Sequence, residues 1–298
     1  MTVIEPRRLV VGVAMGEDCD AALEFAAAEA LRRGCGVHLV HAMHPVWAGP
    51  TDVVDLRLVD GELRKVGVAF LQDCQRRVEK ATGESITVST EIVHEAVVPA
   101  LNEMSQHADL VVLQHHRMGR SRRIPTLSVT NGVAARAHAP VVAVPDTWHE
   151  DAEHPDVVAV GVEDYETSAV VAEAAFEEAR RLGAGLRLVR AWYFSAAIDD
   201  EVFSGAAGVR QTEAVRAEVE NEFAALMARF PDVTCTVDVT HGRPAEVLVE
   251  RSEDVRLLVV GRHQPALPFG SHLGPVTRAV LGYATCPVLV VNPRKLPE

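Results

Sequence analysis

The stretch LVVGVAMGEDCDAALEFAAAEALRRGCGVHLVHAM, Leu9–Met43, recurs later in the chain as VAVGVEDYETSAVVAEAAFEEARRLGAGLRLVRAW, Val158–Trp192. These two copies align without a gap at an offset of 149 residues. Near the end of each half, HADLVVLQHH (His107–His116) aligns with DVRLLVVGRH (Asp254–His263) at an offset of 147 residues. The sequence therefore holds one structural unit twice, and the change of offset marks an insertion or deletion in the variable middle of the unit.

Polar and proline-flanked residues separate the two copies. The segment PDTWHEDAEHPD, Pro145–Asp156, lacks the apolar periodicity of its surroundings, which is typical of a linker between domains. We therefore expect two domains, residues 1–148 and residues 155–298.

Apolar, β-branched runs alternate with helical patterns in each half. One such pattern, CDAALEFAAAEALRRG, is rich in Ala, Leu and Glu and stops at Gly34, as helices often do. Near-continuous apolar strands separated by helices indicate a parallel sheet covered on both faces. The predicted fold class is α/β, with two tandem doubly wound domains, each a five-stranded parallel sheet with flanking helices. The expected strands are Leu9–Ala14, Gly36–Ala42, Ile86–Val93, Leu110–Gln114 and Val141–Val144, then Val157–Val162, Gly185–Ala191, Thr234–Val239, Arg256–Gly261 and Val288–Val291.

Composition restricts the possible partners. The chain has 298 residues, of which 48% are hydrophobic and 24% charged, as in ordinary globular proteins. Its net charge of −13 argues against nucleic acid and anionic membranes as partners. No apolar run is long enough to cross a bilayer, and the N-terminus lacks the order of a signal peptide. The five cysteines include no CxxC pair, which fits thiols in a reducing, cytoplasmic setting.

Three motifs resemble those of the universal stress protein family. The family opens with V-V-G-V-D-G-S, closes with P-V-L-V-V, and carries G-x2-G-x9-G-[S/T] between them. Here the opening reads VVGVAMG in the first half and AVGVEDY in the second, and Pro287–Val291 reads PVLVV. The resemblance covers almost the whole chain, once per half. It implies Rossmann-like domains that pair through their last strands and, in one branch of the family, ATP or a related adenine nucleotide at the strand ends.

In the second half, the glycine motif falls on Gly261, Gln264, Gly274 and Pro275. Glycine at the end of a strand and before a helix leaves room for a phosphate. The side chain of Gln264 and the missing N–H of Pro275 depart from this pattern and weaken an anion site. The resemblance therefore predicts a partly retained nucleotide site; its expected residues are Glu163, Val189, Gly261, Arg262, His263, Gly274, Val276 and Thr277.

The first half departs further from the motif. It has Gln114, Arg117, Leu127 and Ser128 at the corresponding positions, and Ala14 in place of a carboxylate. Leucine would obstruct the phosphate, and alanine cannot bond a ribose, so this site is expected to be degraded. The basic loop Arg117–Arg123 suits another anion or a solvated surface.

Histidines suggest no shared metal site. His38 and His41 are three residues apart on an expected strand and point to opposite faces. No nucleophile elbow, Ser/His/Asp spacing or phosphate-loop lysine is present in the sequence.

The leading hypothesis is a non-catalytic stress-response protein that binds ATP or a related adenine nucleotide weakly in its second half. The alternatives are a nucleotide-free interaction scaffold and a slow ATP hydrolase of the same fold, which fold analogy alone would support. The short apolar segments PVVAV and PVLVV are expected to pair the two halves and to allow a homodimer.

Overall fold

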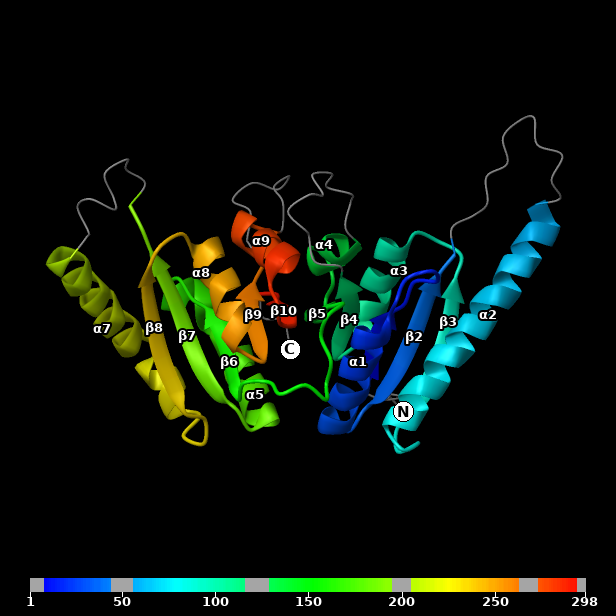
Figure 1. Ribbon diagram of the computed structural model, residues 1–298, viewed down its shortest axis with the longest axis horizontal. Helices are drawn as coiled ribbons and strands as arrows, with labels where there is room; N and C mark the ends of the chain where they lie inside the picture. Colours follow the sequence, from blue (N-terminus) through cyan, green and yellow to red (C-terminus); the bar gives the residue numbers. More distant parts are fainter. Residues whose placement is uncertain (1–7, 44–55, 116–128, 195–204, 263–272, 294–298) are drawn as a thin grey trace, which may run out of the picture. The chain divides into compact units, whose positions relative to one another are not determined.

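The computed structural model describes residues 8–43, 56–115, 129–194, 205–262 and 273–293 (Figure 1). These residues form two compact units: unit 1 comprises the described residues up to 152, and unit 2 comprises those from 153. Within the described ranges, none of the helices combines the length and apolar character needed to cross a membrane.

Unit 1 contains a parallel sheet with the strand order β3-β2-β1-β4-β5. Helices connect successive strands, as parallel pairing requires. Its elements in chain order are β1 (Arg8–Gly12), α1 (Asp20–Arg33), β2 (Gly36–Ala42), α2 (Leu56–Ala81), β3 (Val88–Val93), α3 (Val97–Met104), η1 (Ser105–His107), β4 (Leu110–His115), α4 (Val129–Ala134) and β5 (Val141–Pro145).

Unit 2 repeats this topology, with the strand order β8-β7-β6-β9-β10, again in parallel. Its elements are β6 (Val157–Gly161), α5 (Tyr165–Leu182), β7 (Gly185–Trp192), α7 (Ala206–Ala228), β8 (Cys235–His241), α8 (Pro244–Arg251), η2 (Ser252–Asp254), β9 (Leu257–Gly261), α9 (Pro275–Tyr283) and β10 (Val288–Val291). The predicted α/β fold with two tandem five-stranded parallel sheets is therefore confirmed, and the strand bounds agree to within one or two residues.

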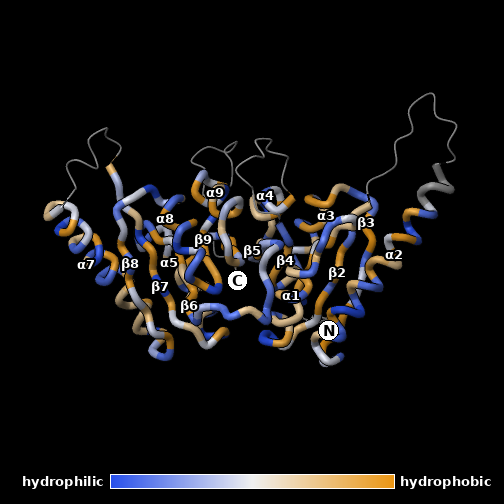
Figure 2. The backbone as a smooth tube through the Cα atoms, in the orientation of Figure 1, coloured by the Kyte–Doolittle hydropathy of each residue, from blue (hydrophilic) through white to orange (hydrophobic). Residues whose placement is uncertain are grey.

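The central strands of each unit are buried on both faces. Residues Leu9–Val11 of β1 and Val158–Val160 of β6 are fully buried. Figure 2 shows that α2 and α7, by contrast, alternate between hydrophobic and hydrophilic residues. This difference follows from position, because a central parallel strand meets helices on both sides whereas an outer helix covers the sheet with one face only.

The glycine that ends the first strand of each unit has a packing role. A Cβ built on Gly12 would lie 2.6 Å from Leu113 and 3.1 Å from Leu101, and one built on Gly161 would lie 2.9 Å from Leu248. Leu101 and Leu248 are repeat equivalents at the offset of 147 residues. The missing Cβ of this glycine therefore makes room for a leucine side chain from α3 or α8. This packing accounts for the glycine without a bound ligand.

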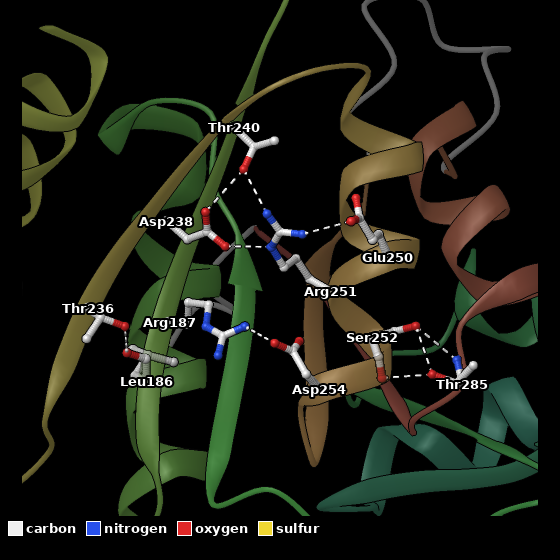
Figure 3. A network of polar contacts seen from close by, with 10 residues as sticks. All are labelled: Leu186, Arg187, Thr236, Asp238, Thr240, Glu250, Arg251, Ser252, Asp254 and Thr285. Carbon is white, nitrogen blue, oxygen red and sulfur yellow. Dashed lines mark hydrogen bonds and ion pairs between the residues drawn. The ribbon is translucent and has the colours of Figure 1, made fainter. Parts of the chain in front are cut away.

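Polar contacts fasten α8 and the turn after it to the neighbouring elements of unit 2 (Figure 3). The Nε of Arg251 donates to Asp238 of β8 at 2.6 Å, and another guanidinium nitrogen donates to Thr240 at 3.0 Å. The Oγ of Ser252 accepts a hydrogen bond from the backbone N–H of Thr285 at 3.0 Å. These bonds hold the turn that leads into β9. The carboxyl end of β9 borders the candidate site.

Candidate functional site

The carboxyl ends of β6, β7 and β9 lie side by side in unit 2, with β6 in the middle. The chain leaves β6 toward β7 on one side and later reaches β9 on the other, so the strand order reverses at β6. Ligands of doubly wound sheets bind outside the carboxyl ends of the strands at such a point. The structure brings Glu163, Val189 and Gly261 of the expected set to this edge.

Glu163 lies two residues after the end of β6 and has an exposed side chain. Its backbone N–H donates to the Oγ of buried Ser168 at 3.0 Å. The next residue, Asp164, caps α5 by accepting the N–H of Thr167 at 2.8 Å. The loop around Glu163 is therefore held by local hydrogen bonds that do not require its carboxylate.

Val189 lies in β7 and is 2% exposed. Its carbonyl accepts the N–H of Val162 at 3.0 Å. The carbonyl group of Val189 is thus already hydrogen-bonded to the residue after β6. At the edge of the sheet, Val189 therefore offers an apolar surface.

Gly261 ends β9 against helix α5. A Cβ at this position would lie 3.0 Å from Cγ2 of Val171, closer than side chains normally approach. Its carbonyl accepts a hydrogen bond from the hydroxyl of Thr277 at 2.8 Å. Thr277 is buried, and its hydroxyl proton is engaged in tying α9 to the end of β9.

The start of α9 presents backbone N–H groups near the end of β9. Gly274 occupies the N-cap position with φ −66° and ψ 166°, an extended conformation that any residue adopts, and no side chain caps the helix. Pro275 is the first helical residue, as expected for a helix start. The N–H groups of Val276 and Thr277 belong to the first turn, where an α-helix has no internal acceptor for them.

Side chains with positive charge flank this helix start. Arg278 donates twice to the carbonyl of Leu273, at 3.1 and 2.9 Å. Arg262 follows β9, its N–H donates to Val291 at 2.9 Å, and partial burial lowers the pKa of its guanidinium, which stays charged because arginine titrates so far above neutral pH. His263 and Gln264 lie outside the described residues.

In unit 1 the same strand end is filled by a side chain. Gln114 of β4 stands where unit 2 has Gly261; its Oε1 accepts the N–H of Ala22 at 3.1 Å, and its Nε2 donates to the carbonyl of Asp18. The amide group therefore caps the N-terminus of α1, where the N-cap residue Cys19 makes no side-chain capping bond and the Asp18 carboxylate accepts the N–H of Asp20. Ala14 is exposed, whereas Arg117, Leu127, Ser128 and the rest of the basic loop lie outside the described residues.

A second substitution accompanies this one. Val171 of α5, which packs on Gly261, is replaced in unit 1 by Ala22 at the offset of 149 residues. Unit 2 thus pairs a large helix residue with glycine, and unit 1 pairs a small helix residue with glutamine. This exchange was not predicted from the sequence, although the two repeat alignments contain its signal when the helix and strand positions are compared together.

The paired histidines of β2 make separate contacts. The ring of His38 is within hydrogen-bond distance of Ser89 at 2.8 Å and of Glu91 at 3.1 Å, and burial lowers its pKa. The Nδ1 of His41 lies 3.0 Å from the carbonyl oxygen of Val13. Among the described residues no group of three or more His, Cys, Asp or Glu side chains could hold a metal ion.

Known proteins resemble this chain along nearly its full length. The model of the universal stress protein family matches residues 5–145 and again residues 155–292. A universal stress protein of Mycolicibacterium smegmatis is 32% identical over 96% of this chain and 97% of its own length. One of Mycobacterium tuberculosis is 31% identical over 97% of this chain and 99% of its own.

A solved structure shows the same fold. The crystal structure of a universal stress protein from Archaeoglobus fulgidus superimposes with a TM-score of 0.68, covering 96% of this chain and 98% of that one at 16% identity. Since the family model matches both halves and the full-length relatives have the same two-domain extent, this chain belongs to the universal stress protein family as a tandem member with two family domains.

Proposed function

We propose that unit 2 binds an adenine nucleotide, ATP or a relative, at the carboxyl ends of β6, β7 and β9, and that the protein acts in the stress response through this binding without catalysis. One observation carries the proposal: at the end of β9 Gly261 has no side chain, whereas Gln114 spans the corresponding strand end of unit 1. The adjacent α5 carries its own cap, Asp164, so unit 2 does not need a side chain from the strand.

Each candidate residue has a distinct role in this proposal. Glu163 supplies an exposed carboxylate for the hydroxyls of a ribose, and Val189 supplies an apolar wall. Arg262, with His263 after it, supplies positive charge for phosphate. The first-turn N–H groups of Val276 and Thr277, which follow Gly274, supply phosphate donors in a favourable helix dipole. Binding is expected to be weak, because Pro275 lacks an N–H and Thr277 donates its hydroxyl proton to Gly261.

A nucleotide-free scaffold is the second candidate, and the packing of Val171 over Gly261 favours it. In that case the glycine serves only to admit the valine. Partner binding would then take place elsewhere on the surface. The oligomeric state expected from the last strands stays a prediction in both cases, and light scattering on the purified chain measures it.

Thermal unfolding with ATP and Mg²⁺ separates the two candidates. We expect millimolar ATP to raise the unfolding temperature of the wild-type chain by mass action. A site-filling variant, Gly261→Gln with Val171→Ala, imitates the residue pair of unit 1 and should lose that shift. Val171→Ala alone keeps the glycine and should retain it. Glu163→Ala, which imitates Ala14, should weaken ATP binding about tenfold through loss of one charged hydrogen bond.

Two results would contradict nucleotide binding at the carboxyl ends of β6, β7 and β9. One is a wild-type chain whose unfolding temperature does not respond to millimolar ATP and which releases no nucleotide on denaturation, as judged by mass spectrometry. The other is an ATP-induced shift that persists in the site-filling variant, since that would place the nucleotide elsewhere.

A further inference from the structure

Two cysteines meet in unit 1 although they are 55 residues apart in the chain. The Sγ atoms of Cys19 and Cys74 are 3.9 Å apart, within hydrogen-bond distance for thiols. Cys19 precedes the first residue of α1, and Cys74 lies in α2, which packs against α1. Both are free thiols and both are buried. An S–S bond of about 2.05 Å needs the two sulfur atoms to approach by roughly 1.9 Å more.

The surroundings of the pair distinguish its two members. Arg77 follows Cys74 by one turn of α2 and forms an ion pair with Asp20, the first residue of α1. The hydrogen bond from Cys74 lowers the pKa of Cys19 against the opposing effect of burial, and the Arg77 guanidinium lowers it further. The same hydrogen bond and burial raise the pKa of Cys74. Cys19 also occupies the N-cap position of α1, where a helix N-terminus stabilises a thiolate, and thiolates are the reactive form of cysteine.

Cys19 is also the member nearer to solvent. The preceding residues, Ala14 to Asp18, are exposed, and Cys19 itself is 5% exposed whereas Cys74 is 0% exposed. A small oxidant would therefore approach the pair from the side of Cys19.

We propose that Cys19 and Cys74 form a reversible dithiol–disulfide site in unit 1, oxidised by hydrogen peroxide. The Cys19 thiolate attacks one peroxide oxygen, the O–O bond breaks, and the departing hydroxide takes up a proton to leave as water. Cys19 is then a sulfenic acid. The Cys74 sulfur attacks the Cys19 sulfur, the S–OH bond breaks, and the hydroxide leaves as water with the Cys74 proton. Overall, two thiols are oxidised to one disulfide, and one peroxide is reduced to two waters.

The repeat restricts this chemistry to unit 1. Unit 2 has Ser168 at the position of Cys19 and Asn221 at the position of Cys74, at offsets of 149 and 147 residues. Two of the remaining thiols are poorly reactive, because burial raises the pKa of Cys235 to about 11 and of Cys286 to about 12. Serine at position 168 also indicates that the fold accepts a hydroxyl at the position of Cys19.

Peptide mapping of the intact wild-type chain tests the proposal directly. After treatment with a small excess of hydrogen peroxide and alkylation of remaining thiols, we expect a cross-linked pair of peptides containing Cys19 and Cys74. The linkage should disappear with dithiothreitol. The oxidised chain should also unfold at a temperature several degrees higher than the reduced one, because the disulfide closes a long loop in the unfolded chain.

Three variants identify the roles. Cys74→Ser should stop the reaction at a Cys19 sulfenic acid that dimedone traps, and Cys19→Ser should abolish both products. Cys235→Ser, the matched control, should form the cross-link as fast as the wild type; circular dichroism verifies that each variant is folded. The proposal is overturned if folded wild-type protein gives no Cys19–Cys74 linkage, or if peroxide oxidises Cys235 before Cys19.

Discussion

At the scale of single residues, the two units differ in how they cap the N-terminus of their first helix. Helix α5 begins at Tyr165 and is capped by Asp164, whereas α1 begins at Asp20 and takes its cap from Gln114 on a strand. The sequence could predict that Gln114 departs from the glycine motif. It could not predict the bond to Ala22, because that contact joins residues 92 positions apart and depends on the packing of β4 beside α1.

The cap of α5 makes stability depend on pH. Asp164→Ala should destabilise the chain by about 1 kcal/mol at neutral pH. Two hydrogen bonds from Thr167 lower the pKa of Asp164 in the folded state. The bond from the backbone N–H has the larger effect, and the bond from the hydroxyl has the smaller. A lowered folded-state pKa means that the stabilisation is present above the unfolded-state pKa of about 3.9 and is lost as the pH falls through the lower folded-state pKa.

Urea denaturation of Asp164→Ala and wild type at several pH values measures this difference. The gap in unfolding free energy should be constant from pH 7 to about pH 5 and should narrow below about pH 4. Asp164→Asn is the matched control, because asparagine caps helices about as well as aspartate and should show little of this pH dependence. A gap that widens at low pH would contradict the assignment of Asp164 as an anionic cap.

At the scale of elements, apolar runs predicted the strands well. The interior of a central parallel strand must be apolar on both faces, and only the ends are set by loop contacts that leave no pattern. Thus the first strand was expected to reach Ala14 but ends at Gly12, and the third was expected from Ile86 but begins at Val88. Helix α1 and its end at Gly34 were also predicted, because helices often end at a glycine. Gly34 has the left-handed conformation that such an end requires, with φ 62°.

A buried serine joins two elements in each unit. Ser252 donates to the carbonyl of Val249 at 2.6 Å and accepts the N–H of Thr285 at 3.0 Å. Its repeat equivalent, Ser105, makes the same kind of bonds to Asn102 and His138 at 2.6 and 2.8 Å. Each hydroxyl thus connects the turn after a helix to the segment that enters the last strand.

Replacing either serine by alanine should cost about 1–3 kcal/mol, because its buried hydroxyl makes two hydrogen bonds that alanine cannot make, each worth about 0.5–1.5 kcal/mol. Ser85→Ala is the control: Ser85 is exposed and also donates to a carbonyl three residues earlier, and its replacement should change the unfolding free energy by less than about 0.5 kcal/mol. Chemical denaturation of the three variants measures these costs. Equal, small effects in all three would show that the buried bonds add nothing.

At the scale of the whole molecule, the internal repeat predicted the architecture. Both copies fold into parallel five-stranded sheets with the same strand order, and each unit has its own buried core. The candidate site was predicted only in outline, since the repeat gives the strand ends but not the side chains that fill them. The meeting of Cys19 with Cys74 was not predicted, because the long helix α2 contributes one of them and their spacing follows no motif.

Independent cores lead to a prediction about the separate halves. A chain of residues 153–298 should fold alone, with a circular dichroism spectrum of mixed helix and sheet and a cooperative thermal transition. If the proposed nucleotide site is correct, this half should also respond to ATP, whereas residues 1–152 should not. A half-chain that binds a hydrophobic dye and melts without cooperativity would contradict the independence of the two cores.

Unit 1 pairs Gln114 with Ala22, whereas unit 2 pairs Gly261 with Val171. This difference also limits how the two halves can be recombined. A chimera that transplants Glu163–Val171 into the place of Ala14–Ala22 would bring a valine against the glutamine and make its capping bonds redundant. Such a graft succeeds only if Gln114 is changed to glycine in the same step. Evolution of either copy toward the other must therefore pass through two coupled substitutions, which helps to keep the two sites distinct once they have diverged.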